Sequence, residues 1–183
     1  MKKLLCLVLL GAGILGASEL ESKCNKGDLV ACVKLGEIYF NEQNYQKSIE
    51  FFKKACDGGY ALGCTGLGKF YADGRGVKQD LVKASELYTK ACDGGDALGC
   101  FVLGFLYEQG FGVTQNYTKA INLYIKSCNN KFGVSCSMVG ALYSNGKGVK
   151  KDKIKAQEYF SKACDLGYQS GCNEYEKINE QGY

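Results

Sequence analysis

The chain has 183 residues, 46% of them hydrophobic, which is enough to build the core of one ordinary domain. Its formal charge is +4, with 23 Lys and Arg against 19 Asp and Glu, and this mixed balance argues against a nucleic-acid or anionic-membrane partner. There is no His, Pro or Trp. The lack of His excludes His-dependent serine or cysteine triads and the usual His-bearing zinc sites. The lack of Pro suits a chain made mostly of helices.

The first 18 residues predict a signal peptide. Two lysines precede an apolar run over residues 4–15, and small residues at 16–18 lead to Glu19. The run is shorter than the roughly 20 apolar residues that a membrane-spanning helix needs. We therefore expect an exported protein, secreted or periplasmic, that loses Cys6 with the signal peptide. An uncleaved anchor is the alternative.

A pattern repeats through most of the remaining chain, at intervals of 36 residues in its later copies. In the second copy its landmarks are Cys64, Leu67-Gly68, Tyr71, Gly74, Gly76-Val77, Asp80, Lys83-Ala84, Leu87-Tyr88 and Cys92. The copies occupy about residues 28–60, 61–96, 97–131 and 132–168, and the polar end, 169–183, is expected to form a capping helix. The first copy lacks the Gly-x-Gly-Val linker and connects its two halves by a shorter segment.

Each copy predicts two helices, A and B, because its landmarks recur at three- and four-residue intervals. Gly74 can end helix A in the left-handed conformation, and Asp80 stands where an N-cap would begin helix B. A glycine inside helix A costs about 1 kcal/mol relative to Ala, so a glycine in every copy predicts a close approach of two backbones. We expect these glycines, Gly36, Gly68, Gly104 and Gly140, to meet the small residues Ser48, Ala84, Ala120 and Ala156 of helix B.

The chain has 11 cysteines, and ten remain once Cys6 is lost. They form five pairs eight positions apart, namely Cys24/Cys32, Cys56/Cys64, Cys92/Cys100, Cys128/Cys136 and Cys164/Cys172. Because an exported chain meets an oxidising compartment and identical units should close identical bridges, we expect each pair to be a disulfide. Metal binding is the alternative, but zinc sites favour a Cys-x2-4-Cys spacing often completed by His, and neither is present.

These landmarks together resemble the Sel-like repeat proteins, which are relatives of the tetratricopeptide repeats. Leu-Gly, Gly-x-Gly-Val and Lys-Ala are each weak alone, but their ordered recurrence with paired cysteines is specific. The resemblance covers about residues 24–175 and extends to the disulfide-bridged Helicobacter cysteine-rich protein family. That family is classed with the β-lactamases, and its members are described as binding or slowly hydrolysing penicillins. The resemblance therefore implies the same activity here.

The sequence offers one stretch that a β-lactamase could use. Such enzymes normally show Ser-x-x-Lys, a Ser-Asp-Asn or Tyr-x-Asn element, and Lys-Thr-Gly. Here residues 144–147 match the first and residues 143–145 match the second, whereas Lys-Thr-Gly is absent. Because the two matches overlap, and Tyr143 and Gly146 are repeat landmarks, we interpret the match as coincidence. Ser144 and Lys147 are the candidate catalytic residues should hydrolysis occur.

A binding groove is predicted from helix A positions whose residue type changes between copies. These positions lie four residues apart, so they share one face, and stacked repeats line such faces along a concave surface. Phe101 and Phe105 are aromatic there and could anchor a ligand, although packing against the neighbouring helix A is the alternative. The candidate groove residues are Thr65, Lys69, Asp73, Phe101, Phe105, Gln109, Ser137 and Asn145, with Val33, Glu37, Asn41 and Ala141 at the same positions of other copies.

We therefore predict an all-α protein, an α/α-solenoid of Sel-like, tetratricopeptide-like repeats stapled by disulfides, forming one domain over residues 19–183. Its expected function is to bind a peptide, a protein or a peptidoglycan-type ligand in the groove. The alternative is a weak β-lactamase or penicillin-binding protein. We expect no cofactor, no metal, no nucleic-acid partner and no membrane span after cleavage.

Overall fold

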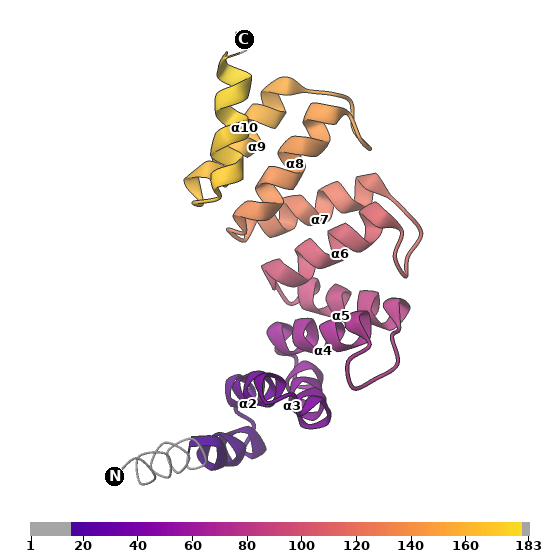
Figure 1. Ribbon diagram of the computed structural model, residues 1–183, viewed down its shortest axis with the longest axis vertical. Coiled ribbons are helices and arrows are strands. Elements are labelled where there is room, and N and C mark those ends of the chain that lie inside the picture. Colours follow the sequence, from indigo (N-terminus) through magenta and orange to yellow (C-terminus); the bar gives the residue numbers. More distant parts are fainter. Residues whose placement is uncertain (1–15, 181–183) are drawn as a thin grey trace, which may run out of the picture.

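Helices account for most of the computed structural model, which describes residues 16–180 (Figure 1). Residues 16–25 are helical, and nine helices follow in the described part of the chain. They are α2 Leu29–Asn41, α3 Tyr45–Asp57, α4 Ala61–Asp73, α5 Leu81–Asp93, α6 Ala97–Gln109, α7 Tyr117–Asn129, α8 Gly133–Asn145, α9 Lys153–Asp165 and α10 Gln169–Glu180. The predicted signal peptide lies outside the described residues apart from its last three. The predicted all-α solenoid is confirmed.

Capping residues set the ends of the helices. Asp80 and Asn116 each accept a hydrogen bond of 2.9 Å from the backbone N–H three residues on, at the beginning of α5 and α7. α4 and α6 end at Gly74 and Gly110, whose φ angles are 68° and 76°. A side chain is strained in this left-handed conformation, which explains why the linker after helix A begins with glycine.

Each A helix packs along the B helix that follows it, and glycine allows the approach. A methyl group added at Gly36 would lie 2.9 Å from the Phe52 ring, and one at Gly104 would lie 2.8 Å from the Tyr124 ring. The small residue of helix B is also close, since the Ser48 hydroxyl donates to the carbonyl oxygen of Gly36 at 2.6 Å. The aromatic ring of helix B, more than its small residue, is therefore what requires glycine in helix A.

The helix pairs stack into an arc with the A helices on its inner side. α2 contacts α4, α4 contacts α6, and α8 contacts α10, each more extensively than any two successive B helices contact one another. Elements on the inside of a curve lie closer together, so these A helices form the concave face. Figure 1 shows the arc running from the N-terminal helices to α10.

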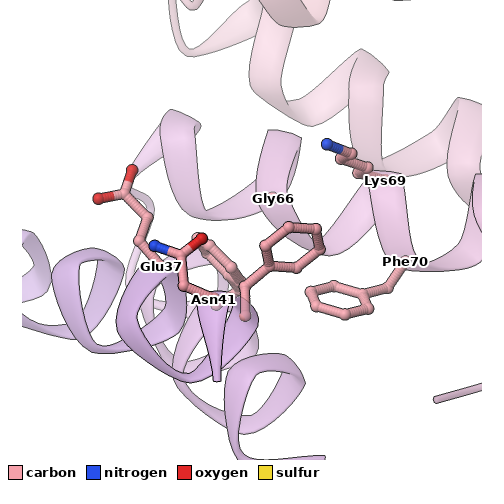
Figure 2. Close-up of a pocket in the computed structure, with 7 residues that line it drawn as sticks. Glu37, Asn41, Gly66, Lys69 and Phe70 are labelled. Carbon is pink, nitrogen blue, oxygen red and sulfur yellow. The ribbon is translucent and has the colours of Figure 1, made fainter. Parts of the chain in front are cut away.

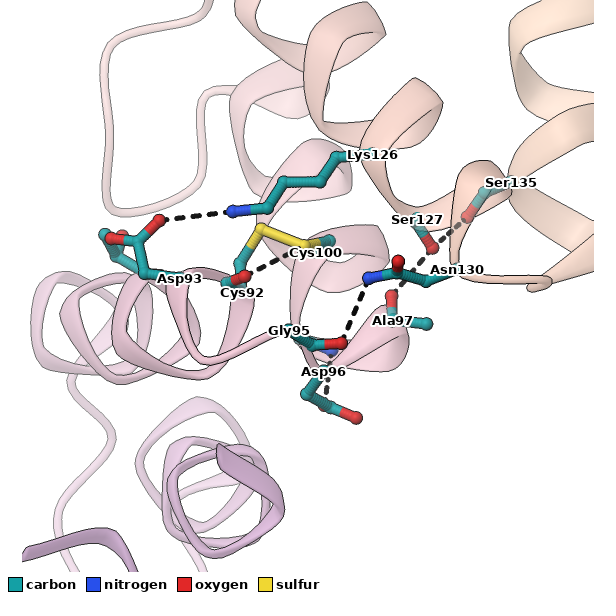
Figure 3. Close-up of a disulfide and its surroundings, with 12 residues drawn as sticks. Cys92, Asp93, Gly95, Asp96, Ala97, Cys100, Lys126, Ser127, Asn130 and Ser135 are labelled. Carbon is teal, nitrogen blue, oxygen red and sulfur yellow. Dashed lines mark hydrogen bonds and ion pairs between the residues drawn. A yellow bond between two sulfur atoms is a disulfide. The ribbon is translucent and has the colours of Figure 1, made fainter. Parts of the chain in front are cut away.

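Five disulfides join the end of one helix to the start of the next A helix. They are Cys24–Cys32, Cys56–Cys64, Cys92–Cys100, Cys128–Cys136 and Cys164–Cys172, with Cα–Cα distances from 4.4 to 4.8 Å. Figure 3 shows that further bonds surround one bridge. Lys126 pairs with Asp93 at 3.3 Å, and the Asn130 amide donates to the carbonyl oxygen of Gly95 at 3.0 Å. Because a repeat contacts only its neighbours, such links substitute for a large core.

The last helix differs from the other A helices at one packing position. Glu176 on α10 stands where α2, α4, α6 and α8 carry the glycine that receives an aromatic ring of helix B. The Glu176 side chain is exposed, while α10 packs against α9 and α8. A charged side chain at this position suits α10 to cap the hydrophobic interior.

Candidate ligand-binding groove

Two adjoining pockets lie on the concave face between α2 and α6. The first has a volume of about 350 Å³ and is lined by Glu37, Phe40, Asn41, Phe52, Gly66, Lys69 and Phe70. The second has a volume of about 380 Å³ and is lined by Glu37, Phe52, Leu62, Thr65, Gly66, Lys69, Tyr88, Leu98 and Val102. Four residues are common to both, so the pockets form one continuous depression, which we call the A-helix groove.

Two opposite charges stand at the rim of this apolar depression. In Figure 2, Glu37 and Asn41 from α2 lie on one side of the first pocket and Lys69 from α4 lies on the other. The Lys69 ammonium nitrogen is 5.1 Å from the centre of the Phe40 ring. Neither Glu37 nor Lys69 forms an ion pair with any residue in the range 16–180. Both charges are therefore available to a ligand.

Gly66 lines both pockets and packs against an aromatic ring. A methyl group there would collide with the Phe52 ring, which reaches up from α3 between α2 and α4. At the same repeat position α2, α6 and α8 carry Lys34, Val102 and Met138. The missing side chain in α4 therefore leaves room for the Phe52 ring, which is itself buried and lines both pockets.

The junction between α4 and α6 is held by a polar pair that occupies little space. The hydroxyl of buried Thr65 donates to Oδ2 of Asp96 at 2.5 Å, and the same oxygen accepts from the backbone N–H of Gly99 at 2.8 Å. Asp96 is the N-cap of α6, so this pair ties the start of α6 to α4. Thr65 also lines the second pocket, and its short side chain leaves that pocket open.

Tyr88 of α5 lies beneath this junction and is 4% exposed. Its hydroxyl forms no hydrogen bond within the described residues. No side-chain oxygen that is fully buried in this part of the chain lacks a partner, so the Tyr88 oxygen retains some access. Tyr88 is also one of the residues that line the second pocket. Burial, with a smaller contribution from Asp73, raises the pKa of Tyr88 well above its usual value, so the phenol stays neutral.

The next junction, between α6 and α8, is filled. Phe101 and Phe132 stand where the α4–α6 junction has Thr65 and Asp96, and their ring centres are 5.4 Å apart. Phe101 also packs against the Tyr124 ring at 5.8 Å. The Tyr124 hydroxyl donates to a carboxylate oxygen of buried Glu108 at 2.8 Å. Burial and this hydrogen bond raise the pKa of Tyr124. The Phe101 ring and the Tyr124 hydroxyl are therefore both engaged within the protein.

The predicted groove residues are distributed unevenly over the structure. Thr65 and Lys69 line the pockets, as do Glu37 and Asn41 at the corresponding positions of α2. The others lie apart from both pockets, namely Asp73, Phe101, Phe105, Gln109, Ser137 and Asn145. Asp73 instead forms an ion pair, with its Oδ2 atom 3.5 Å from Nε of Arg75. Phe105 is 41% exposed and packs edge-on against Phe111 of the following linker. Both of these pockets therefore lie on the N-terminal half of the concave face.

The candidate catalytic residues lie at the far end of the array from the groove. Ser144 is the penultimate residue of α8, and Lys147 follows the left-handed Gly146 in the exposed linker. Neither residue lines either pocket of the A-helix groove. Residues 16–180 contain no group of three or more acidic or cysteine side chains arranged to hold a metal. None of the helices in that range has both the length and the apolar character needed to cross a bilayer.

Several lining residues were missed by reasoning from the sequence. Leu62 and Leu98 stand at one repeat position near the start of successive A helices and are 37% and 40% exposed, which is unusual for leucine. Tyr88 was predicted only as a landmark of helix B, and Phe52 stands at the same position of the first copy. A usable signal was Gly66, a second glycine in α4 at a position where the other copies carry large side chains.

Comparison with known proteins extends the resemblance. A model of the Sel1 repeat family matches residues 29–60, 61–96, 97–132 and 133–168. A protective antigen of uropathogenic Escherichia coli with an SLR fold superposes with a TM-score of 0.81 at 25% identity, covering 91% of this chain and 37% of the antigen. Cysteine rich protein B of Helicobacter pylori gives a TM-score of 0.55 at 30% identity, covering 67% of this chain and 96% of that protein.

Curated relatives match over shorter stretches. The Helicobacter pylori protein named Beta-lactamase HcpA is 39% identical over 75 residues, which is 41% of this chain and 30% of that protein. The chain spans less than a third of the length of each of the related Helicobacter proteins that it matches in this way.

Proposed function

We propose that this chain, which belongs to the Sel1 repeat family, is a disulfide-stabilised binding protein that holds an extended peptide or a peptide-like cell-wall fragment in its A-helix groove. It is related to the Helicobacter cysteine-rich proteins through both sequence and fold. The observation that carries the proposal is the pair of connected pockets, about 350 and 380 Å³, on the concave face of α2, α4 and α6. Their volumes are in the range typical of ligand sites, about 300 to 1,000 Å³.

The chemistry of the groove favours a peptide over a rigid small molecule. The two apolar hollows follow one another across successive A helices, so each can take one side chain of an extended chain. Glu37 and Lys69 stand beside both hollows and can pair with charges or backbone dipoles of the ligand. Exposed Leu62 and Leu98 add apolar contact at the edge. Two successive apolar hollows with charged residues beside them suit a polymer that presents side chains at regular intervals.

The setting is extracytoplasmic, because five disulfides suggest an oxidising compartment. Peptides and peptidoglycan stem peptides are both found there. We propose the periplasm or the extracellular space as the place of binding.

A matched pair of charge substitutions tests the groove. Leu98→Asp puts a carboxylate at the edge of the second pocket, while Val82→Asp puts one on α5 at a residue that is 58% exposed and outside the pockets. The binding assay would screen a random hexapeptide array and soluble muropeptides, followed by fluorescence anisotropy on the strongest hit. We expect Leu98→Asp to weaken that hit at least tenfold and Val82→Asp to leave it unchanged. Equal affinity in all three proteins would refute the groove, as would an array without any hit.

β-Lactam hydrolysis is the second candidate function, favoured by the names of the Helicobacter relatives. Its candidate catalytic residues, Ser144 and Lys147, lie outside the A-helix groove. A chromogenic cephalosporin assay at high protein concentration, repeated with Ser144→Ala, separates the candidates. Turnover that disappears in the variant would support hydrolysis at Ser144, and absence of turnover in the parent protein would remove this function.

A further inference from the structure

We propose that the hydroxyl of Tyr88 is the specificity contact of the second pocket, where it donates a hydrogen bond to a carbonyl oxygen of a bound peptide beside an aliphatic side chain. This inference rests on the proposed function and deepens it, because it names the group that the groove recognises.

Tyr88 is a buried residue whose ring packs on the preceding helix, α4. The residue is only 4% exposed. Its ring packs against Gly68, where an added methyl group would lie 3.1 Å from the ring. The ring is thus fixed in place by its own helix pair. Its hydroxyl has no hydrogen-bond partner among residues 16–180 and is not fully buried, and Tyr88 is one of the residues that line the second pocket. A polar group that loses most of its water on folding gains by bonding to whatever enters the pocket.

Tyr124 occupies the same position as Tyr88 one repeat later. There the hydroxyl donates to Glu108 at 2.8 Å. The residue of α4 that corresponds to Glu108 is Ala72, which offers no side-chain acceptor. The first and last copies need no acceptor, because Phe52 and Phe160, which have no hydroxyl, replace the tyrosine. Among the four B helices α3, α5, α7 and α9, only α5 has a tyrosine hydroxyl at this position without an internal acceptor within residues 16–180.

The residues that line the second pocket with Tyr88 indicate which ligand fits there. The walls around Tyr88 are Leu62, Leu98 and Val102, which suit a branched aliphatic side chain. A neutral phenol is a donor that suits a carbonyl oxygen, and its raised pKa keeps the proton in place. Every residue of a peptide carries that carbonyl next to its side chain. An N-acylated leucine or valine therefore offers both features within one residue.

The experiment uses N-acetyl-leucine methylamide as the probe, titrated into the parent protein and two variants and followed by two-dimensional NMR. Tyr88→Phe removes the hydroxyl from the pocket, and Tyr124→Phe removes the same atom from the neighbouring repeat. N-Acetyl-alanine methylamide serves as the small side-chain control. We expect Tyr88→Phe to weaken the leucine probe about five- to tenfold, as loss of one hydrogen bond implies. Tyr124→Phe should leave its affinity unchanged, and the alanine probe should bind more weakly than the leucine probe.

Thermal unfolding of the same proteins adds a readout that does not depend on a ligand. Tyr88→Phe should unfold at the parent temperature or slightly above it, because the lost hydroxyl has no internal partner. If Tyr88→Phe binds the leucine probe as tightly as the parent while Leu98→Asp does not, the role of Tyr88 is overturned and the groove stands. If the parent fails to bind the leucine probe, the Tyr88 inference also falls, and the hexapeptide array decides separately whether the groove binds peptides.

Discussion

The α4–α6 junction is open and the α6–α8 junction is closed, although both are built from the same repeat. The first has Thr65 and Asp96 at the interface and an unbonded tyrosine hydroxyl beneath it. The second has Phe101 and Phe132 at the same repeat positions, over a tyrosine that is bonded to Glu108. The landmark glycines and cysteines are alike in both. The repeat therefore fixes the scaffold, and a few exchanged side chains decide whether a junction holds a ligand or packs itself.

The largest expected effect comes from emptying the closed junction. Phe101→Ala removes a ring that packs against both Phe132 and Tyr124. We expect the free energy of unfolding to fall by about 3 kcal/mol, near the lower end for Phe→Ala because the ring is only partly buried. The matched change in the open junction, Thr65→Ala, should cost about 1 kcal/mol through one lost hydrogen bond. Chemical denaturation measures both. Equal costs would contradict the claim that only one junction is filled.

A second prediction concerns what the junctions share. Replacing Cys92 and Cys100 together by serine should lower the free energy of unfolding by about 2 to 3 kcal/mol, from the closure entropy of a short loop. Replacing Cys128 and Cys136 should cost the same, because both rings have a sequence separation of 8. Denaturation of the two double variants under oxidising conditions makes the comparison. A difference above about 1 kcal/mol would show that the local environment outweighs the loop.

The smallest effect distinguishes the two tyrosines. Tyr124→Phe leaves the carboxylate of Glu108 buried without its donor, so we expect a loss of about 1 to 2 kcal/mol. Tyr88→Phe should lose nothing measurable. Thermal or urea unfolding of both variants gives the answer. A loss in Tyr88→Phe as large as that in Tyr124→Phe would mean that the Tyr88 hydroxyl already has a partner.

The sequence was sufficient to predict the solenoid, because several independent signals agree at every copy. Asp80 and Gly74, for instance, each mark a helix boundary by a mechanism that does not depend on the rest of the molecule. The glycines of helix A were predicted to allow close approach, and the structure adds that the aromatic ring of helix B is the main group that they admit.

The groove could be predicted only in outline. Thr65 and Lys69 were chosen because they vary between copies, and they do line the pockets. Phe101 satisfied the same criterion, yet whether an aromatic residue faces a ligand or packs depends on its neighbour across the junction. That neighbour is Phe132, which is 31 residues away in sequence. Tyr88 was interpreted as a core residue, since its free hydroxyl becomes visible only when Ala72 is seen to lack the acceptor that Glu108 provides.

Mapping where the leucine probe binds tests the difference between the two junctions most directly. In a two-dimensional NMR titration of the full chain with N-acetyl-leucine methylamide, we predict shifts concentrated at the backbone amides of Gly66, Lys69 and Val102. The amides of Ser137 and Met138 in α8 should remain unperturbed. Shifts centred on α8, or equal shifts at both junctions, would contradict the account.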